Sequence, residues 1–227
     1  MSDLLPVLRV LGALLAMFAL SLLVPLAASL WAGEALWHKY ALAMAVTLGV
    51  AALLWWGLRE HRRELLPRHG VLLVSLVWVV TPFFAALPLL LVMDAIERPL
   101  SFTHAYFEAV SGLTTTGSTV LSSLDELPLS VNMWRTFMQW IGGMGILILA
   151  VAILPVLGVG GSQLFKAEAA GPVKDTKLTP RMTETAKGLW GVYVVFSLAC
   201  ALAYWSAGMT PEDAVMHMFA TVSLGGL

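Results

Sequence analysis

The stretch Phe107-Glu-Ala-Val-Ser-Gly-Leu-Thr-Thr-Thr-Gly-Ser118 decides the fold, because it joins a short apolar helix to a threonine- and glycine-containing strand. The expected helix, Ser101–Leu113, is too short to cross a hydrocarbon core, which needs about 20 residues. A short helix that ends in a non-helical, glycine-containing strand is typical of a re-entrant loop. Such backbone is tolerated at membrane depth only where it is buried in protein or lines a water-filled cavity.

The composition places the rest of the chain in a lipid bilayer. Of its 227 residues, 59% are hydrophobic and 12% are charged, and the mean hydropathy is +0.85. A soluble domain is far less apolar. The net charge of −1 gives no reason to expect a nucleic-acid partner. The single cysteine, Cys200, excludes an internal disulfide and a thiolate metal cluster.

Five apolar segments are long enough to cross the bilayer once each. The first resembles a signal peptide at its start, but it is too long for one and lacks an A-x-A cleavage site, so we expect a retained helix. The expected spans are Pro6–Leu30, Tyr40–Leu58, Gly70–Met93, Met133–Leu157 and Gly188–Ala207. We therefore predict an all-α polytopic membrane protein.

The distribution of basic residues predicts a cytoplasmic N-terminus. If Arg9 is inside, the loops Arg59–His69 and Gly158–Lys187 are also inside, and together they carry most of the basic residues. The basic residues that fall outside are Lys39, Arg98 and Arg135. This bias is the one that the positive-inside rule requires. Acidic residues in the outer loops would attract cations, or they are simply solvated loop residues.

A second stretch repeats the re-entrant pattern at a constant offset of 109 residues, which puts Gly117 over Gly226. Pro211–Val222 is again too short to span. It follows Thr210, an expected N-cap, and has a proline at the first helical position. It leads into Ser223-Leu224-Gly225-Gly226. The chain therefore reads as a spanning pair, a helix–pore–helix unit and the start of a second unit.

This pattern divides the chain into four parts. Residues 1–69 form an N-terminal two-helix membrane segment with a cytoplasmic loop, and residues 70–157 form the first helix–pore–helix repeat. Residues 158–187 are a second cytoplasmic loop, and residues 188–227 start the second repeat. The second loop, with Lys174 and Lys177, is either a solvated linker or a docking surface for a cytoplasmic regulator.

The segments after the two short helices have the character of a cation filter. A dehydrated cation needs oxygen ligands all round it, and a filter supplies them by aiming backbone carbonyls at an axis. Glycine allows the backbone angles that this requires, and the C-terminal end of a helix favours a cation. The candidate filter residues are Thr114, Thr115, Thr116, Gly117, Ser223, Leu224, Gly225 and Gly226. Those expected to bind the ion through their carbonyls are Thr115, Thr116, Leu224 and Gly225.

Other residues allow both a structural and a functional interpretation. Glu108 is an ionisable group on a short helix at membrane depth, where it either braces the filter by hydrogen bonds or serves another role. Gly142, Gly143 and Gly145 either allow close helix packing or form a gating hinge. The sequence has no P-loop, no metal-ligand pair and no nucleophile beside a base, so we do not expect an enzyme.

At these residues the chain resembles the TrkH-type subunit of the Trk/Ktr/HKT superfamily of potassium transporters. The matching stretches are residues 107–118, Gln139-Trp-Ile-Gly-Gly-Met-Gly-Ile146, Ala152-Ile-Leu-Pro-Val-Leu-Gly-Val-Gly-Gly161 and Thr183-Glu-Thr-Ala-Lys187. The resemblance implies four helix–pore–helix repeats around a pseudo-fourfold pore in the bacterial inner membrane, preceded by two extra helices. It also implies K⁺ as the transported ion, a cytoplasmic nucleotide-binding regulatory subunit and a homodimer.

Carried over by position, the resemblance makes Thr114–Gly117 the first filter quarter and Ser223–Gly226 the second. In the superfamily a filter glycine goes with potassium selectivity, and a serine at the first-repeat position occurs in sodium-preferring relatives. Gly117 therefore favours potassium over sodium. The predicted function is uptake of K⁺ down its electrochemical gradient. Two alternatives remain open. One is a sodium-coupled symporter of the Ktr kind; the other is a non-conducting scaffold or remnant, if the chain truly ends at Leu227.

Overall fold

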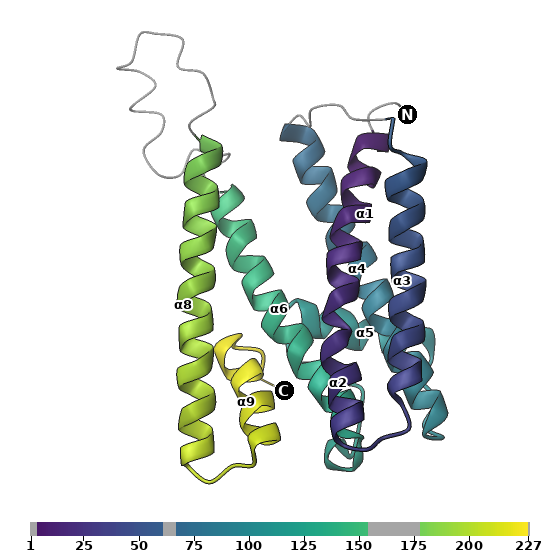
Figure 1. Cartoon of the computed structure of the whole chain (residues 1–227), viewed down its shortest axis with the longest axis vertical. Helices are drawn as coiled ribbons and strands as arrows, with labels where there is room; N and C mark the ends of the chain where they lie inside the picture. Colours follow the sequence, from purple (N-terminus) through teal and green to yellow (C-terminus); the bar gives the residue numbers. More distant parts are fainter. Residues whose placement is uncertain (1–3, 61–66, 154–177, 227) are drawn as a thin grey trace. The chain divides into compact units, whose positions relative to one another are not determined.

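The described part of the chain is helical, without strands (Figure 1). The structure is a computed structural model, and it describes residues 4–60, 67–153 and 178–226. In chain order the elements are α1 (Leu4–Ser21), α2 (Leu23–Trp31), α3 (Trp37–Gly57), α4 (Pro67–Ala95), α5 (Phe102–Leu113), the 3₁₀ turn η1 (Leu124–Glu126), α6 (Leu129–Ile153), α8 (Leu178–Ser206) and α9 (Pro211–Val222). The predicted all-α class is confirmed.

Four helical stretches in the described ranges are long and apolar enough to cross a membrane. They are Leu4–Trp31, Trp37–Gly57, His69–Ala95 and Glu184–Ser206. Each matches one of the predicted spans. The remaining prediction, Met133–Leu157, coincides with α6 as far as Ile153. Its end lies outside the described residues, as do Pro155 and the loop positions Lys174 and Lys177.

The first predicted span is not one continuous helix, because α1 and α2 are separated at Leu22. Pro25 lies in the first turn of α2 and has no N–H to donate to the carbonyl of Ser21. The chain tightens locally instead: the Leu22 N–H donates to Ala19 at 3.2 Å, and the Ser21 hydroxyl donates to the Phe18 carbonyl at 2.6 Å. Proline chemistry therefore explains the break that the apolar run concealed.

The described helices form two compact units. The first comprises Met1–Leu113 and Ser118–Met138, and the second comprises Thr114–Gly117 and Gln139–Leu227. In the first unit α1 packs on α3 and α4, and α5 packs on α4. In the second unit α9 lies along α8, antiparallel to it (Figure 1). The second unit holds both of the predicted filter segments.

Small residues bring helices together in the first unit. A Cβ at Gly12 of α1 would lie 2.8 Å from the Cβ of Leu54 and 3.0 Å from the carbonyl oxygen of Ala51, both on α3. Large apolar side chains such as Met17 and Leu53 remain 69% and 75% exposed. Lipid is as apolar as leucine, so close packing rather than the hydrophobic effect holds membrane helices together. Exposed apolar side chains of this kind are what helices long enough to span a bilayer are expected to carry.

Side chains of neighbouring helices bind α4 near its two internal prolines, Pro82 and Pro88. Each proline lacks the N–H that would donate to the carbonyl four residues earlier, which interrupts the hydrogen-bond ladder of α4. The Tyr106 hydroxyl of α5 donates to the Val79 carbonyl at 3.0 Å, and the Trp134 indole N–H of α6 donates to the Ala85 carbonyl at 3.1 Å. Each of these carbonyls lies three residues before a proline, so both contacts fall in the disturbed turns of α4.

Candidate functional site

The two short helices form where the sequence predicts them. α9 covers Pro211–Val222, and the Thr210 hydroxyl accepts the Asp213 N–H at 3.2 Å, which confirms the predicted N-cap. α5 begins at Phe102 instead of the predicted Ser101. The Ser101 hydroxyl accepts the His104 N–H at 3.2 Å, so Ser101 lies just before the helix and satisfies one of its free donors.

The repeat of 109 residues extends from the sequence to the backbone. α5 and α9 each have 12 residues and begin and end at positions 109 apart. Beyond them, Thr115 and Leu224 have positive φ angles of 55° and 58°, and Gly117 and Gly226 have φ angles of 73° and 67°. Residues other than glycine rarely adopt this conformation. Matched positions therefore share an unusual backbone as well as a place in the repeat.

The C-terminal end of α9 shows how its segment leaves the helix. The Gly225 N–H donates to the Ala220 carbonyl at 2.9 Å, and the Leu224 N–H donates to the Thr221 carbonyl at 3.1 Å. These two bonds form a Schellman motif, in which the left-handed position is normally glycine and here is Leu224. The motif fixes the direction of the chain from Ser223 onward.

The two predicted filter segments lie together in the second unit. A Cβ added to Gly117 would overlap the carbonyl oxygen of Gly225, and its distance to the Gly226 carbonyl carbon would be 3.4 Å. Two observations require glycine at position 117. Its φ is 73°, and the backbone of Gly225 occupies the space of a side chain. The juxtaposition brings residues far apart in the sequence to one place.

The available cation ligands at this place are uncharged oxygens. The Thr114 and Thr116 hydroxyls are hydrogen-bonded to each other at 2.7 Å. The described residues contain no group of three histidine, cysteine, aspartate or glutamate side chains that could hold a metal ion. Backbone carbonyls and hydroxyls suit a weakly hydrated monovalent cation better than a tightly held divalent one.

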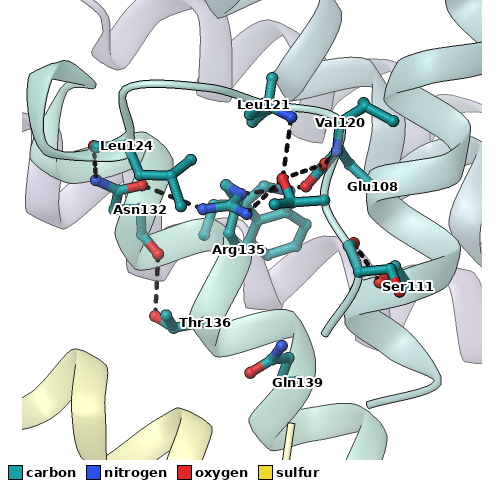
Figure 2. A network of polar contacts seen from close by, with 12 residues as sticks. Glu108, Ser111, Val120, Leu121, Leu124, Asn132, Arg135, Thr136 and Gln139 are labelled. Carbon is teal, nitrogen blue, oxygen red and sulfur yellow. Dashed lines mark hydrogen bonds and ion pairs between the residues drawn. The ribbon is translucent and has the colours of Figure 1, made fainter. Parts of the chain in front are cut away.

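Glu108 lies in a polar network that holds the chain just after the first predicted filter segment, Thr114–Gly117 (Figure 2). Its side chain is buried, and its Oε1 accepts the Thr119 hydroxyl and the Val120 N–H, both at 2.6 Å. One turn along α5, the Ser111 hydroxyl donates to the Ser118 carbonyl at 2.6 Å. The two side chains of α5 therefore fix the chain immediately beyond Gly117.

Arg135 completes the network from α6. Its Nε donates to Glu108 Oε2 at 3.2 Å, and its terminal nitrogens donate to the Thr119 hydroxyl at 3.0 Å and to Asn132 Oδ1 at 3.4 Å. Arg135 is 3% exposed and Glu108 is 2% exposed. The sequence prediction counted Arg135 among the charges of the outer side. In the structure it is a buried residue of α6 that is paired with Glu108, and a buried charge needs such a counter-charge. Its side of the membrane stays a prediction.

Gln139, to which the sequence analysis assigned no role, and Gly143 both lie beside the second segment. The carboxamide of Gln139 donates to the Gly225 carbonyl at 3.3 Å. A Cβ at Gly143 would lie 3.3 Å from the Cα of Ser223 and 2.9 Å from the Tyr193 hydroxyl. Gly143 therefore allows close packing, which is one of its two predicted roles, whereas Gly145 has nothing within 4 Å of such a Cβ. The signal that could have found Gln139 is a polar residue inside an apolar spanning segment.

Comparison with known proteins agrees with this architecture. The family model for TrkH, described as a cation transport protein, matches residues 37–227. The chain is 48% identical over 220 residues to the Trk system potassium uptake protein TrkH of Vibrio parahaemolyticus, with 97% of this chain and 45% of that protein covered. It is 46% identical over 219 residues to the protein of the same name from Escherichia coli K12, with 96% and 44% covered.

A solved structure has the same fold. The crystal structure of the potassium transporter TrkH from Vibrio parahaemolyticus matches with a TM-score of 0.85 and 41% identity, over 99% of this chain and 44% of that one. The chain thus spans less than half the length of the curated relatives that it matches. Because the family model covers most of this sequence and the fold agrees, the chain belongs to the TrkH family of cation transport proteins.

Proposed function

We propose that this protein takes up potassium across the bacterial inner membrane, with Thr114–Gly117 and Ser223–Gly226 as two quarters of its selectivity filter. The observation that carries the proposal is the matched pair of short helices and segments, with positive φ at the same two positions of each. Alternation of left-handed and ordinary residues lets successive carbonyls face one side. Thr115, Thr116, Leu224 and Gly225 are the proposed carbonyl ligands of K⁺.

The relatives' names support potassium as the transported ion and a Trk system as the setting. We extend both to this chain as part of the proposal. The N-terminus is then cytoplasmic, and the loop 158–187 is the proposed docking surface for a nucleotide-binding regulatory subunit. The homodimer that the resemblance implies belongs to the same proposal.

Replacement of Gly117 tests the filter. In the complete product of the gene, expressed in a host without its own potassium uptake, Gly117→Ser forces a side chain into a left-handed position and against Gly225. A left-handed residue with a side chain costs about 1–2 kcal/mol, and the segment can relieve this strain only by changing the direction of its carbonyls. We therefore expect the preference for K⁺ over Na⁺ to fall. Uptake of ⁸⁶Rb⁺, a tracer for K⁺, relative to uptake of ²²Na⁺ measures this preference.

A matched control is Gly49→Ser on α3, where a Cβ would have no neighbour within 4 Å. It should leave the ratio unchanged. Equal selectivity in Gly117→Ser and the unmodified protein, at equal amounts in the membrane, would refute Gly117 as a filter residue. Repeating the potassium uptake with and without sodium separates a uniporter from a sodium-coupled symporter.

A further inference from the structure

One polar side chain beside the second filter segment has no role in the description so far. Gln139 lies on α6, and its side chain is fully buried, at 0% exposure. Its Nε2 donates to the Gly225 carbonyl at 3.3 Å. Its Oε1 is also buried, and no described residue provides it with a hydrogen-bond partner.

The carboxamide packs directly on the backbone of Gly225. A Cβ on Gly225 would overlap both Oε1 and Cδ of Gln139, and it would lie 2.9 Å from Nε2. Gly225 must therefore be glycine for the amide to reach its carbonyl. On its other side the same carbonyl oxygen occupies the space of a side chain at Gly117. The Gly225 peptide is consequently held between Gln139 and the first filter segment.

The part of α6 that carries Gln139 is firmly fixed in the second unit. The indole N–H of the adjacent Trp140 donates to the Ser197 hydroxyl of α8 at 2.9 Å, and the Trp140 carbonyl accepts the Tyr193 hydroxyl at 2.9 Å. The ring of Trp140 also lies 5.6 Å from that of Phe219 in α9. A donor on this support has little freedom to move, so it can set the direction of a carbonyl.

Stability alone does not explain a glutamine here. A buried acceptor without a hydrogen-bond partner lowers the stability of the fold. Replacing the polar groups of such a site by apolar groups of the same shape can leave the stability unchanged or raise it. An unbranched apolar side chain of similar size, such as methionine, would fill the same space. The amide of Gln139 therefore acts on the Gly225 peptide, which it contacts.

We propose that Gln139 is a positioning residue of the filter, whose carboxamide orients the Gly225 carbonyl and thereby sets the discrimination between K⁺ and Na⁺. The inference rests on the proposed function and adds a residue outside the filter segments to it. Gln139 binds no ion itself. It acts through the backbone of Gly225, so its loss should change selectivity more than protein stability.

The test uses Gln139→Met in the complete gene product, with uptake of ⁸⁶Rb⁺ and ²²Na⁺ as the readout and thermal unfolding in detergent as a second measurement. The Gln139→Met variant leaves the Gly225 carbonyl without its side-chain donor, so we expect the uptake ratio of ⁸⁶Rb⁺ to ²²Na⁺ to fall without a lower melting temperature. Gln139→Asn withdraws the amide from Gly225 by one methylene and should move the ratio in the same direction, which keeps the test decisive where the methionine variant folds poorly.

The matched control is Thr136→Val, one turn earlier on α6. The Thr136 hydroxyl bonds only to carbonyls of its own helix among the described residues, at 3.0 and 3.3 Å, so its loss should not alter the ratio. An unchanged ratio in both Gln139 variants, beside a selective unmodified protein, overturns this inference alone. An unmodified protein without potassium uptake overturns the proposed function and this inference with it.

Discussion

At the scale of single residues, the proposed filter segments depend on conformations that most side chains avoid. Thr115 and Leu224 adopt positive φ without being glycine, at matched positions of the two segments. Such residues persist only where their surroundings hold them in place. Around the first segment, Ser111 and Glu108 hold the chain by hydrogen bonds to the residues immediately beyond Gly117. The strain is therefore local and its restraints are identifiable.

The pair of Glu108 and Arg135 gives a prediction at this scale. Glu108→Gln leaves the Arg135 guanidinium buried without a counter-charge, which costs about 3–5 kcal/mol. We expect a clearly lower melting temperature in detergent. The double variant Glu108→Leu with Arg135→Met removes both charges and should recover most of the stability, because apolar replacement of a buried pair is often neutral.

The double variant also separates folding from filter bracing. It lacks the acceptor for the Val120 N–H and the Thr119 hydroxyl, so the residues beyond Gly117 keep the hydrogen bond from Ser111 but lose those to Glu108. We expect its preference for K⁺ over Na⁺ to stay reduced in the tracer assay although its stability returns. Full selectivity in a stable double variant would mean that the network supports the fold and not the filter.

At the scale of secondary-structure elements, α4 packs on α5 and accepts a side-chain hydrogen bond from each of α5 and α6. Its two prolines disturb the backbone of a spanning helix, and both hydrogen bonds reach carbonyls three residues before a proline. Tyr106 of α5 and Trp134 of α6 are the two donors.

Trp134 offers the cleaner test of this arrangement, because it is fully buried and its indole N–H reaches the Ala85 carbonyl. Trp134→Phe keeps an aromatic ring and removes the donor. We expect a loss of about 1 kcal/mol, visible as a lower melting temperature in detergent. Trp56→Phe is the control, since Trp56 is 69% exposed on α3. Equal melting temperatures for the two variants would argue against a role of the bond in stability.

At the scale of the whole molecule, each of the two units has its own structural role. The first unit contains the N-terminal helices and α5 with the side chains that bind it, and the second contains both proposed filter segments. Relatives of this chain are more than twice as long as the part that it matches. The pseudo-fourfold pore that we propose would use two filter segments of this chain as half of its wall.

The proposed orientation can be tested with single cysteines in a Cys200→Ala background. Arg59→Cys lies at the proposed cytoplasmic end of α3, and Asp125→Cys lies on the exposed turn η1, on the proposed outer side. In right-side-out vesicles an impermeant maleimide should label the cysteine at position 125 and not that at position 59. Both should react after the vesicles are opened. Labelling in the reverse order would contradict a cytoplasmic N-terminus.

The sequence by itself determined the features that depend on local composition and spacing. Apolar length predicted spans that the helices reproduce, although it hid the break at Leu22, and turn chemistry predicted α9 with its cap at Thr210. The offset of 109 residues also anticipated the matched backbone conformations. Apolar length and cap residues are local signals, and the offset is a comparison of the sequence with itself, so no knowledge of packing is needed to recognise them.

Only the tertiary structure decided which distant residues meet. Arg135 is 27 residues from Glu108, and Gln139 is 86 residues from Gly225, so no periodicity links either pair. The sequence showed a charged arginine and a glutamine in an apolar helix, and it could not show their partners. Partnership depends on how helices approach, which close contacts such as that of Gly143 with Ser223 control. The physical reason is that a buried polar group must find a partner, whereas the packing of the helices determines which residue that partner is.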